Sequence, residues 1–275
     1  MDRIVVPLDE SALSERALPI AQQIGRQTGA SVQLVEVVPP DEVDRANRFL
    51  QDRASTLSGV DASVEVIASE TGQPVADAIR AGLGTPDESL LCMTSHGRSG
   101  LGAALLGSTA EDLLRGSDRP VLIVGRECAL PWPGHRRTLL VPVDGSEEGE
   151  RILRSVADVV ERSDLQPVLV QVAHPFDVAE ANHAGEALEH ARRRLVGLGL
   201  DPKTEHRFAS NIALTLDEVA RTWGAALIAL TFSVPPGAPR TLLGSVTMST
   251  IRHAPCPVLV FPGHVLADPR AEGSI

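Results

Sequence analysis

The chain has 275 residues, of which 43% are hydrophobic and 22% are charged, and its formal net charge is −11. This composition is typical of a folded protein, and no apolar run approaches the roughly 20 residues that a membrane helix needs, so a membrane protein is excluded. The acidic balance argues against nucleic acid as a partner, because binding to a phosphate backbone uses clustered Lys and Arg.

The first residues, MDRIVVPLDES, pass directly into a strand pattern, and their apolar run is too short for a signal peptide. The three cysteines, Cys92, Cys128 and Cys256, are odd in number and widely spaced. This pattern indicates neither a disulfide framework nor a Cys-x-x-Cys metal site, and it favours a reducing compartment. We therefore expect a cytoplasmic protein.

Val- and Leu-rich runs of strand length alternate with helical patterns over the first 125 residues. The predicted strands are 5–8, 31–38, 62–69, 89–95 and 120–125, and the predicted helices are 14–29, 41–59, 72–83 and 108–117. This alternation implies right-handed crossovers and a parallel sheet that is covered on both faces. In such sheets, ligands bind beyond the carboxyl ends of the strands, near the point where the strand order reverses.

The order of strands and helices in the first half repeats in the second half of the chain. Residues 3–24 read RIVVPLDESALSERALPIAQQI, and residues 138–159 read TLLVPVDGSEEGERILRSVADV, so each has a strand, Pro-x-Asp-x-Ser and an amphipathic helix. LLGSTAEDLLRGSDRPVLIV, from Leu105, likewise matches LLGSVTMSTIRHAPCPVLVF, from Leu242. A tandem duplication predicts two α/β domains, each a doubly wound, Rossmann-like parallel sheet of five strands. The expected domains are 1–127 and 136–263, with a boundary in the Pro-rich stretch 126–137 and a tail at 264–275.

A glycine-rich loop, TSHGRSGLGAALLGST, covers residues 94–109 and follows the fourth strand. Its last part, Gly107 and Ser108, opens a helix. A helix N-terminus offers unpaired N–H groups and about half a positive charge, and glycine lets an anion approach the backbone, so this geometry suits a phosphate. The alternative is that Ser108 and Glu111 form a capping box and the glycines only make turns.

Two other phosphate motifs do not fit this loop. Gly102 and Gly107 have Walker A spacing, but Ser108 holds the position of the lysine that grips the outer phosphates. Gly100 and Gly102 begin a dinucleotide fingerprint, but Leu105 replaces its third glycine, and the loop follows the fourth strand and not the first. The sequence therefore favours neither a P-loop nor an NAD site.

With this loop, the Pro-x-Asp-x-Ser turns and the closing Pro-Val-Leu strands, the chain resembles a tandem member of the universal stress protein family. The nucleotide signature of that family is Gly, two residues, Gly, nine residues, then Gly followed by Ser or Thr. Gly97 and Gly107-Ser108 match it, whereas Thr94 stands where the first glycine is expected. The resemblance covers nearly all of both halves and implies an adenine nucleotide alpha hydrolase-like fold.

The resemblance implies a stress-response module that binds an adenine nucleotide, namely ATP with Mg²⁺ or Mn²⁺. Adenine and ribose would lie near Pro7, Asp9 and Val37, although from the residues alone an Asp just before a helix is more often a cap than a ligand. The residues that would line the sugar and the phosphates are Met93, Thr94, His96 and Gly97, followed by Gly107, Ser108 and Thr109.

The second half keeps less of the signature. Thr231 and Val234 occupy the two glycine positions, and three prolines without donors stiffen the loop. The residues that remain as candidates for a weaker site are Asp144, Gly244, Ser245 and Val246. We therefore expect the first half to bind nucleotide better than the second half, which is a weaker site or a structural partner.

Binding without catalysis is the favoured function, since no residue stands out as a general base. A weak ATPase or phosphotransfer enzyme, and a ligand-free interaction scaffold, stay open as alternatives. His183, Glu186 and His190 have helical spacing and could ligate a metal, but their flanking charges favour a solvated helix face. The resemblance also implies pairing through the last strands, 120–125 and 257–262, either within one chain as a pseudo-dimer or in a homodimer.

Overall fold

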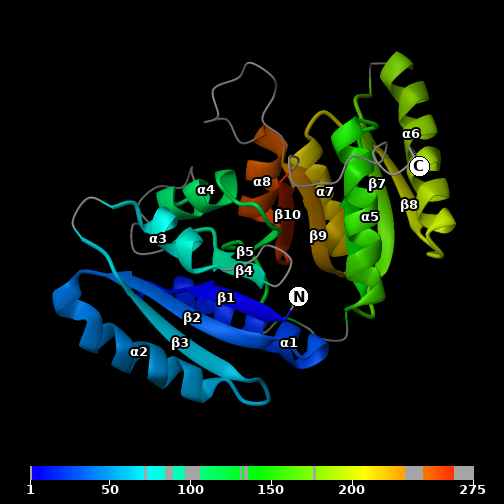
Figure 1. Ribbon diagram of the computed structural model, residues 1–275. Helices are drawn as coiled ribbons and strands as arrows, with labels where there is room; N and C mark the ends of the chain where they lie inside the picture. Colours follow the sequence, from blue (N-terminus) through cyan, green and yellow to red (C-terminus); the bar gives the residue numbers. More distant parts are fainter. Residues whose placement is uncertain are drawn as a thin grey trace, which may run out of the picture. The chain divides into compact units, whose positions relative to one another are not determined.

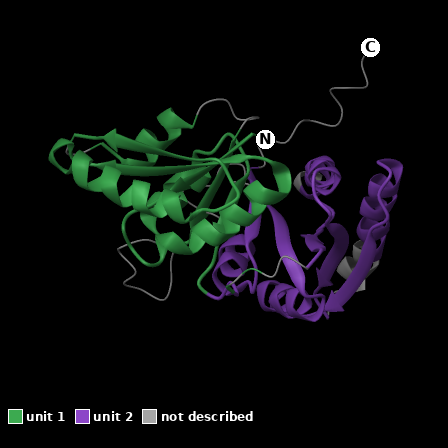
Figure 2. Cartoon of the chain, turned by 90° about the horizontal axis from the view of Figure 1, so that it is seen from below, with its two compact units in different colours: residues 1–126, 130–132 green, residues 127–129, 133–275 purple. Residues whose placement is uncertain are grey.

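The computed structural model describes residues 2–70, 73–83, 89–96, 106–130, 132, 136–175, 178–232 and 244–262. The chain divides into two compact units, shown in green and purple in Figure 2. Unit 1 comprises residues 1–126 and 130–132, and unit 2 comprises residues 127–129 and 133–275. By its contacts, the short segment 127–129 thus belongs to the second unit.

Unit 1 contains five parallel strands in the order β3-β2-β1-β4-β5. They are β1 (Arg3–Pro7), β2 (Ser31–Val38), β3 (Ala62–Ala68), β4 (Ser89–Thr94) and β5 (Val121–Val124). The chain moves from β1 toward β3 and then returns to β4 on the other side of β1. The strand order therefore reverses between β1 and β4, which makes their carboxyl ends the place where this fold binds ligands.

The helices of unit 1 cover both faces of this sheet, as right-handed crossovers require (Figure 1). They are α1 (Leu18–Thr28), α2 (Val43–Thr56), α3 (Val75–Gly82) and α4 (Ser108–Arg115). Short 3-10 helices, Ser14–Ala17 and Pro40–Glu42, lead into α1 and α2. α1 approaches the sheet closely at Gly25, where a Cβ atom would lie 2.9 Å from the Ala30 carbonyl oxygen.

Unit 2 repeats this order as β8-β7-β6-β9-β10, again with parallel strands. The strands are β6 (Thr138–Pro142), β7 (Gln166–Ala173), β8 (Lys203–Phe208), β9 (Ala225–Phe232) and β10 (Val258–Pro262). The helices are α5 (Glu147–Glu161), α6 (Val178–Gly197), α7 (Ile212–Thr222) and α8 (Ser245–His253). The predicted fold class, two tandem doubly wound sheets of five parallel strands, is confirmed.

Aliphatic side chains from the central strands form the core, with Ile4, Val6, Leu34 and Leu91 fully buried. Cys92 is fully buried in β4, and none of the three cysteines, all of which lie in the described ranges, forms a disulfide. Within the described ranges, no helix combines the length and the apolar character that crossing a membrane requires.

Candidate functional site

The turn after β1 is closed by its own side chains. One carboxylate oxygen of Asp9, Oδ1, accepts hydrogen bonds from the Ser11 amide at 3.1 Å and from the Ser11 hydroxyl at 2.6 Å. The Ser11 Oγ in turn accepts from the Ser14 amide at 3.1 Å, at the start of the following helix. Asp9 thus shapes the turn, and the Ser11 hydroxyl accepts a hydrogen bond from the first amide of the 3-10 helix that begins at Ser14.

Unit 2 builds the same turn with the same atoms. Asp144 Oδ1 accepts from the Ser146 amide at 2.9 Å and from its hydroxyl at 2.6 Å. Ser146 is the N-cap of α5 and accepts from the Gly149 amide at 3.0 Å. The interpretation of Asp9 as a helix cap is wrong, because its carboxylate binds Ser11 and the N-cap of the following helix is Leu13, which makes no side-chain cap bond.

The two turns differ at the residue after the aspartate. Glu10 has a φ of +61°, a left-handed conformation that no other described residue except glycine adopts, and Gly145 has +77° at the same position of unit 2. The Glu10 carboxylate lies 3.2 Å from the Arg45 guanidinium of α2. This ion pair ties the turn of unit 1 to α2. Asp9 is half-buried in its turn, whereas Asp144 is exposed.

The expected adenine-side residues lie at the same end of the sheet. Pro7 is opposite Val35 in the β1-β2 ladder, and Val37 lies two residues further along β2, opposite Ile67 of β3. Val37 is half-buried. Because β1 ends at Pro7, Val37 extends past the end of β1 on the side of the Asp9 turn.

The end of β4 is held in place by short-range hydrogen bonds. The Ser95 amide donates to the Val124 carbonyl at 3.1 Å, and the Thr94 hydroxyl donates to the His96 carbonyl at 2.7 Å. His96 Nδ1 lies 3.1 Å from the Ser95 hydroxyl. Met93 is buried within the sheet. Thr94 therefore uses its hydroxyl to shape the start of the loop. Gly97 lies outside the described residues.

α4 begins against this strand end. The Gly107 amide donates to the Ser95 carbonyl at 2.8 Å, and the first helical bond runs from the Glu111 amide to the Gly107 carbonyl at 2.9 Å. Gly107 is the N-cap, and as a glycine it has no side chain that could cap the helix. Ser108 is exposed and Thr109 is half-buried. The amides of the first turn, starting with Ser108, precede that first helical bond.

The capping-box interpretation is wrong. A capping box needs the serine at the N-cap and the glutamate three residues later, whereas here Gly107 takes the N-cap and Ser108 is the first helical residue. The Glu111 carboxylate instead pairs with Arg115, one turn further along α4.

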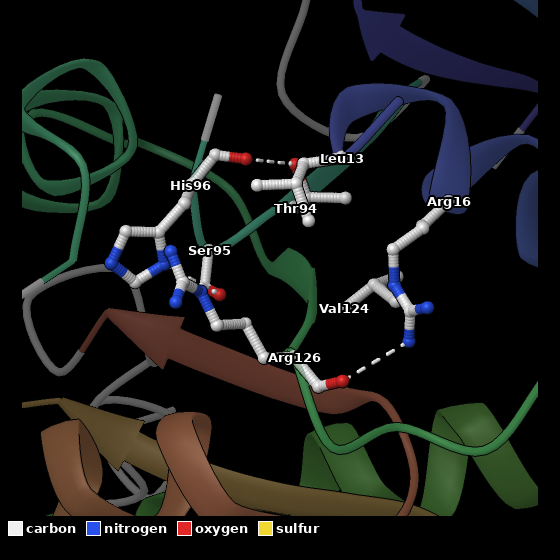
Figure 3. Close-up of a pocket in the computed structure, with 8 residues that line it drawn as sticks. Leu13, Arg16, Thr94, Ser95, His96, Val124 and Arg126 are labelled. Atoms are coloured by element: carbon white, nitrogen blue, oxygen red, sulfur yellow. Dashed lines mark hydrogen bonds between the residues drawn. The ribbon is translucent and has the colours of Figure 1, made fainter. Parts of the chain in front are cut away.

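A small pocket opens beside the start of this loop (Figure 3). Its lining residues are Leu13, Arg16, Thr94, Ser95, His96, Val124, Gly125 and Arg126. Arg16 Nη2 donates to the Arg126 carbonyl at 3.2 Å, and Figure 3 shows the Arg126 side chain extending toward Ser95 and His96. The pocket thus brings two guanidinium groups to the carboxyl ends of β4 and β5, which favours an anion nearby. The sequence analysis missed both arginines, because neither belongs to a motif.

The equivalent region of unit 2 keeps the helix start. Gly244 is the N-cap of α8 without a side-chain cap, Ser245 is exposed and Val246 is half-buried. The Thr247 hydroxyl donates to the carbonyl of Thr231, near the end of β9, at 3.3 Å. The predicted proline-stiffened loop before Gly244 lies outside the described residues.

The helical histidines do not assemble a metal site in the described part of the chain. His190 Nε2 lies 3.5 Å from the Glu150 carboxylate, and Glu186 is exposed. The side chain of His183 lies outside the described residues. No group of three His, Cys, Asp or Glu residues that could hold a metal ion occurs in the described ranges.

Comparisons with known proteins agree with the repeated architecture. The sequence profile of the Universal stress protein family matches residues 1–125 and again residues 135–262. A Staphylococcus epidermidis protein that carries the universal stress protein name is 30% identical over 139 residues, which cover 45% of this chain and 82% of that protein.

A solved structure of a universal stress protein shows the same fold. The crystal structure of a universal stress protein from Archaeoglobus fulgidus DSM 4304 superposes with a TM-score of 0.75 and 21% identity, over 95% of this chain and 98% of that chain. A second Archaeoglobus fulgidus universal stress protein, solved in complex with dAMP, matches 45% of this chain and 96% of its own, with 19% identity and a TM-score of 0.38.

Proposed function

The chain belongs to the universal stress protein family, and we propose that its first unit binds an adenine nucleotide, ATP in particular, between the carboxyl ends of β1 and β4. Nucleotide occupancy would then make the protein a nucleotide-dependent binding or sensing module of the stress response. Domain limits of 1–127 and 136–263 are part of this proposal.

The start of α4 carries the proposal. Its N-cap is a glycine, which has no side chain to occupy the helix start, and the bond from the Gly107 amide to the Ser95 carbonyl fixes it beside the end of β4. Amides that precede the first helical bond, together with the positive end of the helix dipole, favour a phosphate at this position. The exposed hydroxyl of Ser108 adds a donor, as do the guanidinium groups of Arg16 and Arg126 in the adjacent pocket.

The turn after β1 supplies the other end of the proposed site. Asp9 is half-buried at the switch point, and its Oδ1 is engaged by Ser11. We assign Pro7, Asp9 and Val37 to the adenine and ribose. This assignment places the base and the phosphates on opposite sides of the strand-order reversal, as in other doubly wound sheets.

A divalent cation would accompany the phosphates. In the described ranges, no three acidic, His or Cys side chains gather into a cage, so Mg²⁺ or Mn²⁺ would bind chiefly phosphate oxygens and water. In unit 2, the exposed Asp144 and the helix start at Gly244 support a weaker site formed with Ser245 and Val246.

The direct test is chemical analysis of what the purified protein carries. We expect mass spectrometry of the released small molecules to find an adenine nucleotide, and calorimetry with ATP and magnesium to give a saturable heat. An absence of both would contradict nucleotide binding and leave an interaction scaffold. Metal-dependent release of ADP from the bound nucleotide would instead identify an ATPase.

A further inference from the structure

The interface between α7 and α8 in unit 2 contains a buried carboxyl group, that of Asp217. The two helices pack against each other, and Asp217 is only 5% exposed. In the described part of the chain, neither of its carboxylate oxygens accepts a hydrogen bond. The hydroxyl of Thr250, fully buried on α8, also has no partner among the described residues. Buried carboxylates normally accept hydrogen bonds, so the ionised form of Asp217 is destabilised at this position.

The guanidinium of Arg221 and the imidazole of His253 lie near Asp217, and both contact a different carboxylate, that of Glu127. Arg221 lies one turn further along α7, and its Nη2 is 3.2 Å from Glu127 Oε2. His253, the last residue of α8, has Nδ1 3.2 Å from Glu127 Oε1. Glu127 is half-exposed, so solvent also stabilises its charge. An exposed and a buried carboxylate thus share the same two neighbours, a guanidinium and an imidazole.

Glu127 belongs to a short segment that is held on unit 2. Next along the chain, Cys128 is buried, and the Ala129 amide donates to the Pro255 carbonyl at 3.0 Å. Cys256 lies near Asp217, but burial raises the pKa of its thiol, so it adds no charge at neutral pH. Glu127 therefore holds the segment 127–129 to α7 and α8 through Arg221 and His253, and the backbone bond holds it to Pro255, just after α8.

We propose that Asp217 is a proton-operated latch: with a proton bound, it allows α7, α8 and the segment 127–129 to pack together, and its ionisation loosens this junction. A neutral Asp217 leaves Arg221 and His253 on Glu127. A charged Asp217 must either draw these side chains away from Glu127 or gain water by opening the helix interface, because an unpaired buried charge is strongly disfavoured.

The direction of the pH dependence follows from the surroundings of Asp217. Burial raises its pKa from 3.8 to about 6; His253 and Arg221 oppose this rise, and Glu127 and Glu218 add to it. The folded form therefore binds the proton more tightly than the unfolded chain. The stabilisation that the protonated Asp217 gives to the folded form is complete below about pH 4, and it is lost as the pH rises through about 6. With these two pKa values, the linkage relation predicts that the equilibrium constant for the packed over the opened junction falls about tenfold between pH 5 and pH 7.

Hydrogen exchange on the full chain tests the latch. Protection of α7 and α8 amides, corrected for the intrinsic effect of pH on exchange, should fall about tenfold from pH 5 to pH 7. The isosteric variant Asp217→Asn cannot ionise and should show nearly constant protection over this range. α3 and α4 of unit 1 serve as an internal reference and should not share the change.

The variant His253→Asn tests whether Asp217 or His253 is responsible for the pH dependence. If His253→Asn abolishes the pH dependence while Asp217→Asn retains it, histidine carries the effect and the proposal is wrong. Constant protection of α7 and α8 in the wild-type protein would also overturn it. A carboxyl-carbon NMR titration of aspartate-labelled wild-type protein needs no variant: one aspartate titrating near pH 6 is expected, and none doing so would contradict the latch.

Discussion

The Gly107 amide donates to the Ser95 carbonyl across the ends of a helix and a strand, at 2.8 Å. This bond joins two residues near the opposite ends of the glycine-rich loop and holds the start of α4 beside the end of β4. The first-turn amides of α4 are therefore positioned at the carboxyl end of β4 by the scaffold. A site held in this way is partly preorganised for an anion, which reduces the ordering that binding requires.

Ser108→Ala should separate binding from stability. Because Ser108 does not cap α4, we expect its removal to change the free energy of unfolding by less than about 0.5 kcal/mol. We also expect it to weaken ATP binding about tenfold, since a hydroxyl bonded to a phosphate contributes on the order of 1.5 kcal/mol. Isothermal titration and urea unfolding measure the two effects.

The matched control is Ser146→Ala, which removes the observed N-cap of α5. It should cost about 1 kcal/mol of stability and leave the tighter ATP site unaffected. A stability loss in Ser108→Ala equal to that in Ser146→Ala, with unchanged ATP affinity, would show that Ser108 is structural.

Glu10→Gly should stabilise the protein. Glu10 has a φ of +61°, which costs a residue with a Cβ atom about 1 kcal/mol or more. Part of this gain is offset by the greater freedom of glycine in the unfolded chain and by the loss of the Arg45 ion pair. We expect a net gain of about 0.5 kcal/mol, measured as a higher urea midpoint.

Gly145→Ala is the reverse change in unit 2. Gly145 has a φ of +77°, and an added Cβ would lie 2.9 Å from the Ala187 Cβ. It should destabilise the protein by about 1 kcal/mol or more. If Glu10→Gly lowered stability instead, the tie from Glu10 to α2 through Arg45 would outweigh the backbone strain.

The sequence predicted the repeating architecture well because local patterns determine it. The strand predicted at 31–38 coincides with β2, Ser31–Val38, since its Val-rich run has clear ends. The Pro-x-Asp-x-Ser turns lie where the sequence predicts them, but Asp9 is not the cap of the helix that follows, whose N-cap is Leu13. The choice of cap depends on which oxygen reaches the next amide, and the residue types alone do not fix it.

Features that depend on contacts between distant segments were not predictable. In LTLDEVART, Asp217 looks like an ordinary charged residue of a helix surface, but it is buried in the fold, where α7 packs against α8. Similarly, Arg16 reaches the Arg126 carbonyl across 110 positions of sequence. No short-range pattern contains either relationship, so only the assembled fold reveals them.

Arg119→Ala should damage stability without altering the nucleotide site. The Arg119 side chain is almost fully buried, and it donates to the Leu83 carbonyl at 3.1 Å and to the Ser89 hydroxyl. These groups lie at the amino ends of β4 and β5, away from the proposed ligand. We expect a loss of about 3 kcal/mol in urea unfolding, because a cavity forms and the buried Ser89 hydroxyl loses the bond from Arg119, while the Leu83 carbonyl still accepts from Arg3 and Ser89.

Arg26→Ala is the matched control for this prediction. Arg26 also donates to a backbone carbonyl, that of Ser58 at 2.8 Å, but it is exposed. Its removal should cost less than about 1 kcal/mol. ATP affinity of folded Arg119→Ala protein should equal that of the wild type, and a clear loss of affinity would show that the amino ends of the strands influence the site.

The two units should differ in their response to loss of the turn carboxylate. An asparagine side-chain oxygen can still accept both bonds from the serine of the turn, so Asp9→Asn and Asp144→Asn remove charge while they preserve each turn. Because Asp9 is half-buried at the proposed tighter site, Asp9→Asn should weaken the first ATP-binding event about tenfold, whereas Asp144→Asn should leave it unchanged. Calorimetric titration with ATP and magnesium reports both events in one experiment. Two equal sites in the wild type, each weakened only by its own substitution, would contradict the ranking of the units and show that unit 2 binds as well as unit 1.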